Sequence, residues 1–198
     1  VDSSAHRNVE LVNLLGKIAL AEESYNYAIE LFEQTLHLAQ EKGIAHCEAR
    51  ALVNLGVSFV RLGNQSDAEK YLKEGVRVAR SGNHLERIAF GSMNLGVMYH
   101  QRGRLNQALE YYTECKNLFR RLGNQTQLAR VMYNLALLFR AIGDIQRAKA
   151  HNEEAAKLAK KCNVEKLQVL SKVLSVRLFS DTDSTNEACH QFEALAEN

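Results

Sequence analysis

The sequence repeats itself with a period of 40 residues. Residues 54–68 (NLGVSFVRLGNQSDA) align without gaps with residues 94–108 (NLGVMYHQRGRLNQA) and with residues 134–148 (NLALLFRAIGDIQRA). Extended in both directions, this register covers nearly all of the 198 residues. A repeat of this size is typical of stacked copies of one supersecondary unit, in which each copy contacts its neighbours. The sequence therefore predicts one repeat domain over residues 1–198.

Each period has the pattern of two helices. In the first half, apolar residues recur at helical spacing, as at Leu52, Leu55 and Phe59, and a glycine such as Gly63 stands where that helix should end. The absence of proline favours long helices over a loop-rich β fold. The expected repeats are residues 5–43, 44–82, 83–123, 124–162 and 163–198. The expected helices are residues 5–22, 25–41, 45–62, 65–81, 84–102, 105–121, 125–142, 145–161, 164–180 and 185–197.

Helix starts are marked by capping-box spacing. Asn83, Asn124 and Ser184 are each followed three residues later by glutamate or glutamine. A side-chain oxygen at the N-cap accepts a hydrogen bond from a backbone N–H one turn later, so these three residues are predicted N-caps.

Small and large residues recur in register and predict the core. Gly16, Gly56, Gly96 and Ala136 occupy one register position. Twelve residues after it, alanine stands in all five periods: Ala28, Ala68, Ala108, Ala148 and Ala188. Four residues further on come Phe32, Leu72, Tyr112, Asn152 and Phe192. Small side chains allow two helix axes to approach closely beside a short turn, and the larger residues fill the space beyond.

These residues resemble the tetratricopeptide repeat family. In the third period its pattern reads Leu95-Gly96, Tyr99, Ala108, Tyr112 and Cys115. The period is 40 rather than the usual 34 or so, and the family's terminal proline is replaced by residues such as Arg80; both features are typical of the long-repeat subclass that includes Pins-type adaptors and kinesin light chains. The resemblance implies an all-α fold, a right-handed superhelical solenoid of five helix-turn-helix repeats.

The resemblance also implies that the first helices line a concave groove that binds a partner peptide. Asn54, Asn94 and Asn134 recur there, and an asparagine amide can both donate to and accept from an extended peptide backbone. The other first-helix positions expected to face the groove are Arg50, Val57, Arg61, Phe90, Val97, His100, Gln101, Arg130, Leu137 and Arg140. The excess of arginine among them favours an acidic peptide or a C-terminal carboxylate.

Plainer interpretations of the same residues stay open. The asparagines could bond each first helix to its neighbour, and the arginines could simply solvate an exposed face. No nucleotide-binding loop, nucleophile elbow, C-x-x-C pair or H-E-x-x-H motif is present, so we expect no catalytic residues, no metal and no cofactor. A net charge of +2 argues against nucleic-acid binding, and no apolar run is long enough for a membrane span. A reduced, cytoplasmic setting is expected.

Three functions remain after these exclusions. The leading hypothesis is a non-catalytic adaptor or scaffold that binds a partner peptide in its groove. One alternative is a sensor or regulatory module of a larger signalling protein. The other is self-assembly, because the segment 164–180 carries apolar residues around much of its circumference and needs cover from further repeats or from a second copy in a homo-oligomer.

Overall fold

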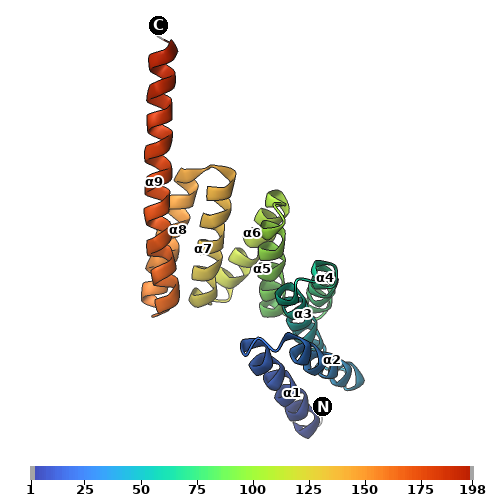
Figure 1. The fold of residues 1–198 in the computed structure, drawn as a ribbon. Helices are drawn as coiled ribbons and strands as arrows, with labels where there is room; N and C mark the ends of the chain where they lie inside the picture. Colours follow the sequence, from blue (N-terminus) through green and yellow to red (C-terminus); the bar gives the residue numbers. More distant parts are fainter. Residues whose placement is uncertain (1–2, 197–198) are drawn as a thin grey trace. The chain divides into compact units, whose positions relative to one another are not determined.

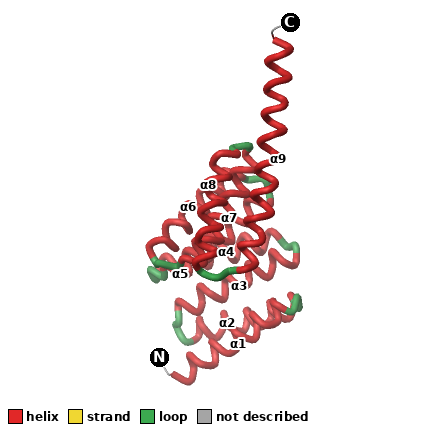
Figure 2. The backbone as a smooth tube through the Cα atoms, turned by 90° about the vertical axis from the view of Figure 1, so that its left-hand side faces the viewer, coloured by secondary structure: helices red, strands yellow, loops and turns green. Residues whose placement is uncertain are grey.

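The computed structural model describes the backbone of residues 3–196 and the side chains of residues 6–181. All regular secondary structure in this part is helical, which confirms the expected all-α repeat fold (Figure 1 and Figure 2). The helices are α1 (Ser3–Ala21), α2 (Tyr25–Glu41), α3 (Ala45–Leu62), α4 (Gln65–Ser81), α5 (Leu85–Gln101), α6 (Leu105–Arg121), α7 (Gln125–Ile142), α8 (Ile145–Lys161) and α9 (Glu165–Ala196).

The helices fall into two compact units, Val1–Leu118 and Phe119–Asn198. In the first unit, α1 packs against α2 and α3 packs against α4, while α3 also contacts the first helices on either side of it, α1 and α5. In the second unit, α7 packs against α8, and α9 packs mainly on α8. Within each unit the repeat therefore produces antiparallel helix pairs, and the second helix of one pair packs against the first helix of the next.

Close contacts at the glycine register position hold these pairs together. A Cβ atom added to Gly56 would lie 2.5 Å from Leu72 Cγ, and one added to Gly96 would lie 2.6 Å from the ring of Tyr112. Leu72 and Tyr112 are themselves buried, as is Ala108 in the alanine register. In the first four periods, the predicted ladder of small and large residues is therefore buried in the core of the helix pairs, as the sequence indicated.

The predicted N-caps are confirmed at one position and wrong at another. Asn124 accepts a hydrogen bond of 3.1 Å from the backbone N–H of Gln127. Asn83 is not an N-cap: it adopts a left-handed conformation with φ of 52°, and His84 precedes α5 without a side-chain cap. Asn83 instead reverses the chain after α4, a task in which its short polar side chain tolerates positive φ.

The fifth repeat departs from the prediction. Residues 164–180 and 185–197 were expected to form two helices, with Ser184 as an N-cap, but α9 runs without a break through that turn (Figure 1). The physical reason is the turn chemistry. Seven of the eight turns between the described helices reverse at a glycine or asparagine of positive φ, such as Gly143, and the first reverses at Glu23. Residues 180–184 (SDTDS) contain neither glycine nor asparagine. The side chains of Ala188, Phe192 and Leu195, predicted to cover α9, lie outside the described side chains.

None of the helices in the described part of the chain is both long and apolar enough to cross a bilayer.

Candidate peptide-binding site

Two adjoining hollows lie on the first-helix face of the first unit, between α1, α3 and α5. One has a volume of about 200 Å³ and the other about 350 Å³. They share Lys17, Arg50 and Arg87, so they form one continuous surface, which we call the groove. The first hollow is also lined by Val53, Asn54, Val57, Phe90 and Asn94. The second is also lined by Glu10, Leu11, Asn13 and Leu14.

Five of the thirteen residues predicted from sequence line the groove: Arg50, Asn54, Val57, Phe90 and Asn94. The other four predicted residues of the first unit lie outside both hollows. Arg61 and Gln101 are exposed, and Val97 is half-buried. The ring of His100 packs edge-on against Tyr112, with 6.3 Å between ring centroids, and burial lowers the pKa of His100.

The remaining four predicted residues belong to α7, in the second unit. Arg130 is exposed, whereas Asn134 and Leu137 are half-buried. Arg140 donates a hydrogen bond of 2.7 Å from Nε to Asp181 Oδ2 on α9. This ion pair raises the pKa of Arg140 and lowers the pKa of Asp181. Arg140 therefore joins α7 to α9 and already has an acidic partner.

One asparagine of the groove bonds the neighbouring first helix, and the other bonds its own helix. Asn54 Nδ2 donates to Oδ1 of the buried Asn13 at 2.9 Å, which ties α3 to α1. Asn94 Nδ2 donates to the carbonyl oxygen of Phe90 at 2.8 Å, within its own helix. Among the described residues, none donates to Oδ1 of Asn54 or Asn94 in turn. Each amide thus has a structural bond and an acceptor that a ligand can use.

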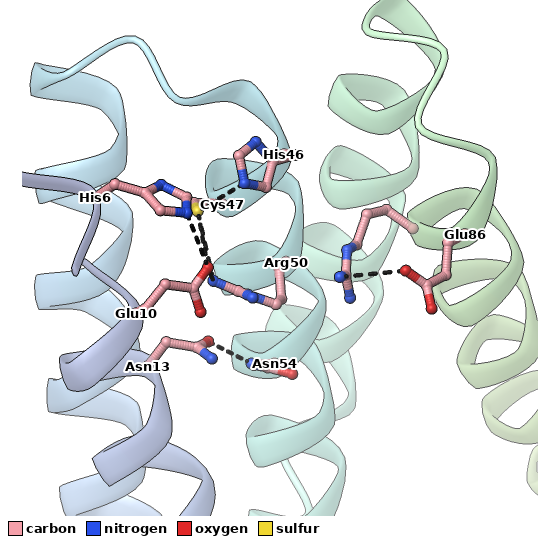
Figure 3. A network of polar contacts seen from close by, with 9 residues as sticks. His6, Glu10, Asn13, His46, Cys47, Arg50, Asn54 and Glu86 are labelled. Atoms are coloured by element: carbon pink, nitrogen blue, oxygen red, sulfur yellow. Dashed lines mark hydrogen bonds and ion pairs between the residues drawn. The ribbon is translucent and has the colours of Figure 1, made fainter. Parts of the chain in front are cut away.

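The charged residues of the groove are three cations and one acid. Arg50 donates from Nη2 to Glu10 Oε1 at 2.5 Å (Figure 3), and its own buried Nε has no hydrogen-bond partner among the described residues. Burial alone would raise the pKa of Glu10, but the hydrogen bond and charge of Arg50 outweigh it and the pKa is lowered. Arg87 contacts Glu86 at 3.4 Å. Lys17 forms no ion pair within the described part of the chain.

Several groove residues were missed at the sequence level, although the register held a signal for them. Lys17 stands 40 residues before Val57, and Glu10 stands 40 residues before Arg50. Shifting the predicted groove residues Arg50 and Val57 back by one period would therefore have found both Glu10 and Lys17. Arg87 carries no such signal, because its register partner is Cys47, a buried residue outside the predicted groove.

A second polar cluster adjoins the groove at Glu10. His6 and Glu10 from α1 and His46 and Cys47 from α3 place their donor atoms within 4.8 Å of one another (Figure 3). Burial raises the pKa of the Cys47 thiol to about 11. Burial, followed by the charge of His6, lowers the pKa of His46. These are residue types that coordinate transition metals.

Solved structures with the same fold come from proteins of different roles. BtubC from P. vanneervenii is 18% identical with a TM-score of 0.74, covering 98% of this chain and 83% of its own. A kinesin light chain with nearly identical repeats, from Podosopora anserina, is 15% identical with a TM-score of 0.71, covering 98% and 94%. The Rap conjugation regulator of plasmid pLS20, solved in complex with a Phr peptide, is 16% identical with a TM-score of 0.80, covering 88% and 47%.

The chain thus spans about half the length of the Rap regulator. No protein with a curated description matches the sequence. The pattern that defines the tetratricopeptide repeat matches residues 9–81 and 87–161, which together exceed half of the chain. It describes an interaction repeat and indicates no catalytic family. This chain belongs to the tetratricopeptide repeat family.

Proposed function

We propose that this chain is a non-catalytic protein-interaction module, and that its groove binds an extended acidic segment of a partner protein. The observation that carries the proposal is the charge of the groove: Lys17, Arg50 and Arg87 border both hollows, and Glu10 is the acid among the residues that line them. Arginine and lysine side chains recognise carboxylates through charge-assisted hydrogen bonds. The groove is therefore suited to aspartate and glutamate side chains or to a terminal carboxylate.

The apolar lining suits a mixed sequence rather than a purely acidic one. Val57 and Phe90 are half-buried in the first hollow, while Leu11 and Leu14 are 57% and 51% exposed beside the second. Large exposed apolar side chains beside fixed cations are typical of sites that bind apolar anchor residues. We therefore expect acidic residues to be separated by apolar ones in the bound segment.

The relatives support an interaction role without naming the partner. The Rap regulator was solved with a bound Phr peptide, and the family to which this chain belongs is built of interaction repeats. The acidic character of the ligand rests on the groove residues alone.

A titration with synthetic peptides tests the proposal. Fluorescent peptides of equal length and apolar content, but of graded aspartate and glutamate content, would be bound to the chain at two ionic strengths. We expect affinity to rise with acidity, and Lys17→Glu to weaken the acidic peptides about fivefold at low salt, since an exposed charge contributes about 1 kcal/mol. The loss should shrink at high salt. Lys70→Glu, the same change on an exposed residue of α4, is the control; equal losses in both variants would contradict the proposal.

Self-association through α9 is a second candidate function. Val169, Val173 and Val176 form a stripe on one side of α9 and are 60%, 47% and 68% exposed, whereas Leu167, Leu174 and Leu178 on the opposite side are buried. A second copy of the chain could cover this stripe. Light scattering should then show a mass that grows with concentration and that Val173→Glu returns to the monomer value. A mass independent of concentration would rule out this candidate.

A further inference from the structure

Four potential metal ligands from two different repeats meet beside the groove. His6 and Glu10 are four residues apart on α1, so their side chains lie on one face of that helix. His46 and Cys47 lie in the first turn of α3, which packs against that face (Figure 3). The sequence showed no metal motif, because the ligands form two pairs that only the packing of α1 on α3 brings together.

Three of the six distances between the possible ligand atoms are close to those around a tetrahedral ion. Zinc binds sulfur at about 2.3 Å and nitrogen or oxygen at about 2.0–2.2 Å, which places neighbouring ligand atoms about 3.3–3.6 Å apart. Here Cys47 Sγ lies 3.3 Å from His46 Nε2 and 3.6 Å from Glu10 Oε1. His6 Nε2 lies 3.8 Å from Glu10 Oε1. The remaining pairs lie within 4.8 Å, so shifts of about 1 Å in these side chains would complete the coordination sphere.

The chemistry of the set favours one class of metal. Two imidazoles, one thiol and one carboxylate are the ligand types of zinc sites, whereas calcium and magnesium prefer sets made of oxygen atoms. Binding requires Cys47 to lose its proton. The thiolate and the Glu10 carboxylate would then balance the two positive charges of the ion.

The repeat itself supplies an internal comparison. One 40-residue period after His6 and Glu10 stand His46 and Arg50. One period after His46 and Cys47 stand Glu86 and Arg87. At that next junction Glu86 and Arg87 contact each other at 3.4 Å. Packing between first helices therefore does not require glutamate at the position of Glu10, histidine at that of His46 or cysteine at that of Cys47, and the first junction is set apart by its ligand chemistry.

We propose that His6, Glu10, His46 and Cys47 bind a Zn²⁺ ion that joins the first repeat to the second. The ion would fix α1 against α3 at the end of the groove. Arg50, which donates to Glu10 and lies 3.4 Å from Cys47 Sγ, would remain a hydrogen-bond donor to the bound carboxylate. Removal of the metal should therefore lower the stability of the α1–α3 junction.

Cobalt substitution tests the proposal on the whole chain with reduced cysteines. One equivalent of Co²⁺ should produce the visible absorption bands of a tetrahedral site and a sulfur-to-cobalt charge-transfer band. Zn²⁺ should abolish both by displacing the Co²⁺. Cys47→Ala should remove the charge-transfer band. Cys47→Ala and His46→Ala should each weaken the affinity by more than about 100-fold, because loss of even an outer-shell partner of a ligand costs about 10–100-fold. Zn²⁺ should also raise the unfolding temperature of the wild-type chain and not of these variants.

Two controls keep the test decisive. Cys115→Ala replaces a cysteine that is as fully buried as Cys47, and His37→Ala replaces an exposed histidine on α2; both should bind Co²⁺ as the wild type does. Circular dichroism confirms that each variant is folded. A charge-transfer band that is absent from the wild type, persists in Cys47→Ala, or is lost equally in Cys115→Ala would overturn the assignment.

Discussion

Arg50 and Glu10 hold the same position in consecutive repeats, 40 residues apart, and their side chains meet at 2.5 Å. The pair is largely shielded from solvent on the arginine side, where the side chain is 16% exposed. It lies where the groove meets the histidine and cysteine cluster, so Glu10 belongs to both proposed sites. One carboxylate therefore limits the free positive charge of the groove and supplies a ligand atom to the metal site.

This dual position predicts opposite effects of one substitution. Glu10→Gln should strengthen the binding of acidic peptides, because Arg50 loses the acid that neutralises it, and the gain should be a few-fold at low salt. The same change should weaken Co²⁺ binding, because a neutral amide is a poorer metal ligand. Fluorescence titrations with peptide and absorbance titrations with Co²⁺ on the same preparation measure both effects. Weaker binding of acidic peptides in a folded Glu10→Gln variant would contradict the proposed role of Arg50.

The alanine register predicts a contrast between neighbouring residues of α6. Ala108 is fully buried and Gln107 is exposed. Ala108→Leu should lower the free energy of unfolding by about 1–3 kcal/mol, since it forces extra volume into a close-packed site. Gln107→Leu should change it by about 0.5 kcal/mol or less. Urea unfolding followed by circular dichroism provides the comparison. Equal midpoints for the two variants would show that Ala108 is not at a tight contact.

Most of the fold could be predicted because the 40-residue period and the turn residues indicated the same helix bounds. The bounds of α3, α7 and α8 coincide with the expected ranges. Glycines at the ends of α3 and α7 adopt the left-handed conformation that such turns require, with φ of 84° and 89°. The continuous α9 was missed because the alanine register pointed to a fifth pair, whereas the local sequence lacks the glycine or asparagine found at seven of the eight turns between the described helices.

The hydrogen bonds of one carboxylate on α4 predict that the stability of the folded chain decreases at low pH. Glu69 accepts hydrogen bonds from Tyr99 Oη at 2.7 Å and from Arg102, both on or next to α5, and pairs with Lys73 at 2.7 Å. The hydrogen bond from Lys73, followed by that from Tyr99, lowers the pKa of Glu69 from 4.5 to about 2. The folded state therefore favours the ionised form, so this contribution to stability is complete above pH 4.5 and is lost as the pH falls toward 2.

Glu69→Gln should remove that pH-dependent contribution. The unfolding temperature of the variant should lie below that of the wild type near neutral pH, and the difference should shrink between pH 4.5 and pH 2. Differential scanning calorimetry across this range measures both chains. A difference that stays constant with pH would mean that the contacts around Glu69 do not depend on its charge.

The candidate site was predictable only in part, for a physical reason. Arg50, Asn54 and Val57 were found because the concave positions of a repeat follow directly from its register. The ion pair of Arg140 with Asp181 could not be found in this way, because it depends on how α9 packs beside α7. Asn13, which accepts the hydrogen bond of Asn54, was missed because valine, methionine and tyrosine take its place in the next three periods. Sequence periodicity thus locates a face, and tertiary contacts decide which of its groups are free.

Site-specific photo-cross-linking tests the central claim most directly. A benzophenone amino acid would replace Val57 in the groove or, as a control, Arg77, which is 67% exposed on α4. Each protein would be irradiated with the fluorescent acidic peptides, and the cross-linked products mapped by mass spectrometry. The groove proposal predicts cross-linking from position 57 that excess unlabelled peptide suppresses, and little from position 77. Equal cross-linking from both positions, or cross-linking from position 77 alone, would contradict it.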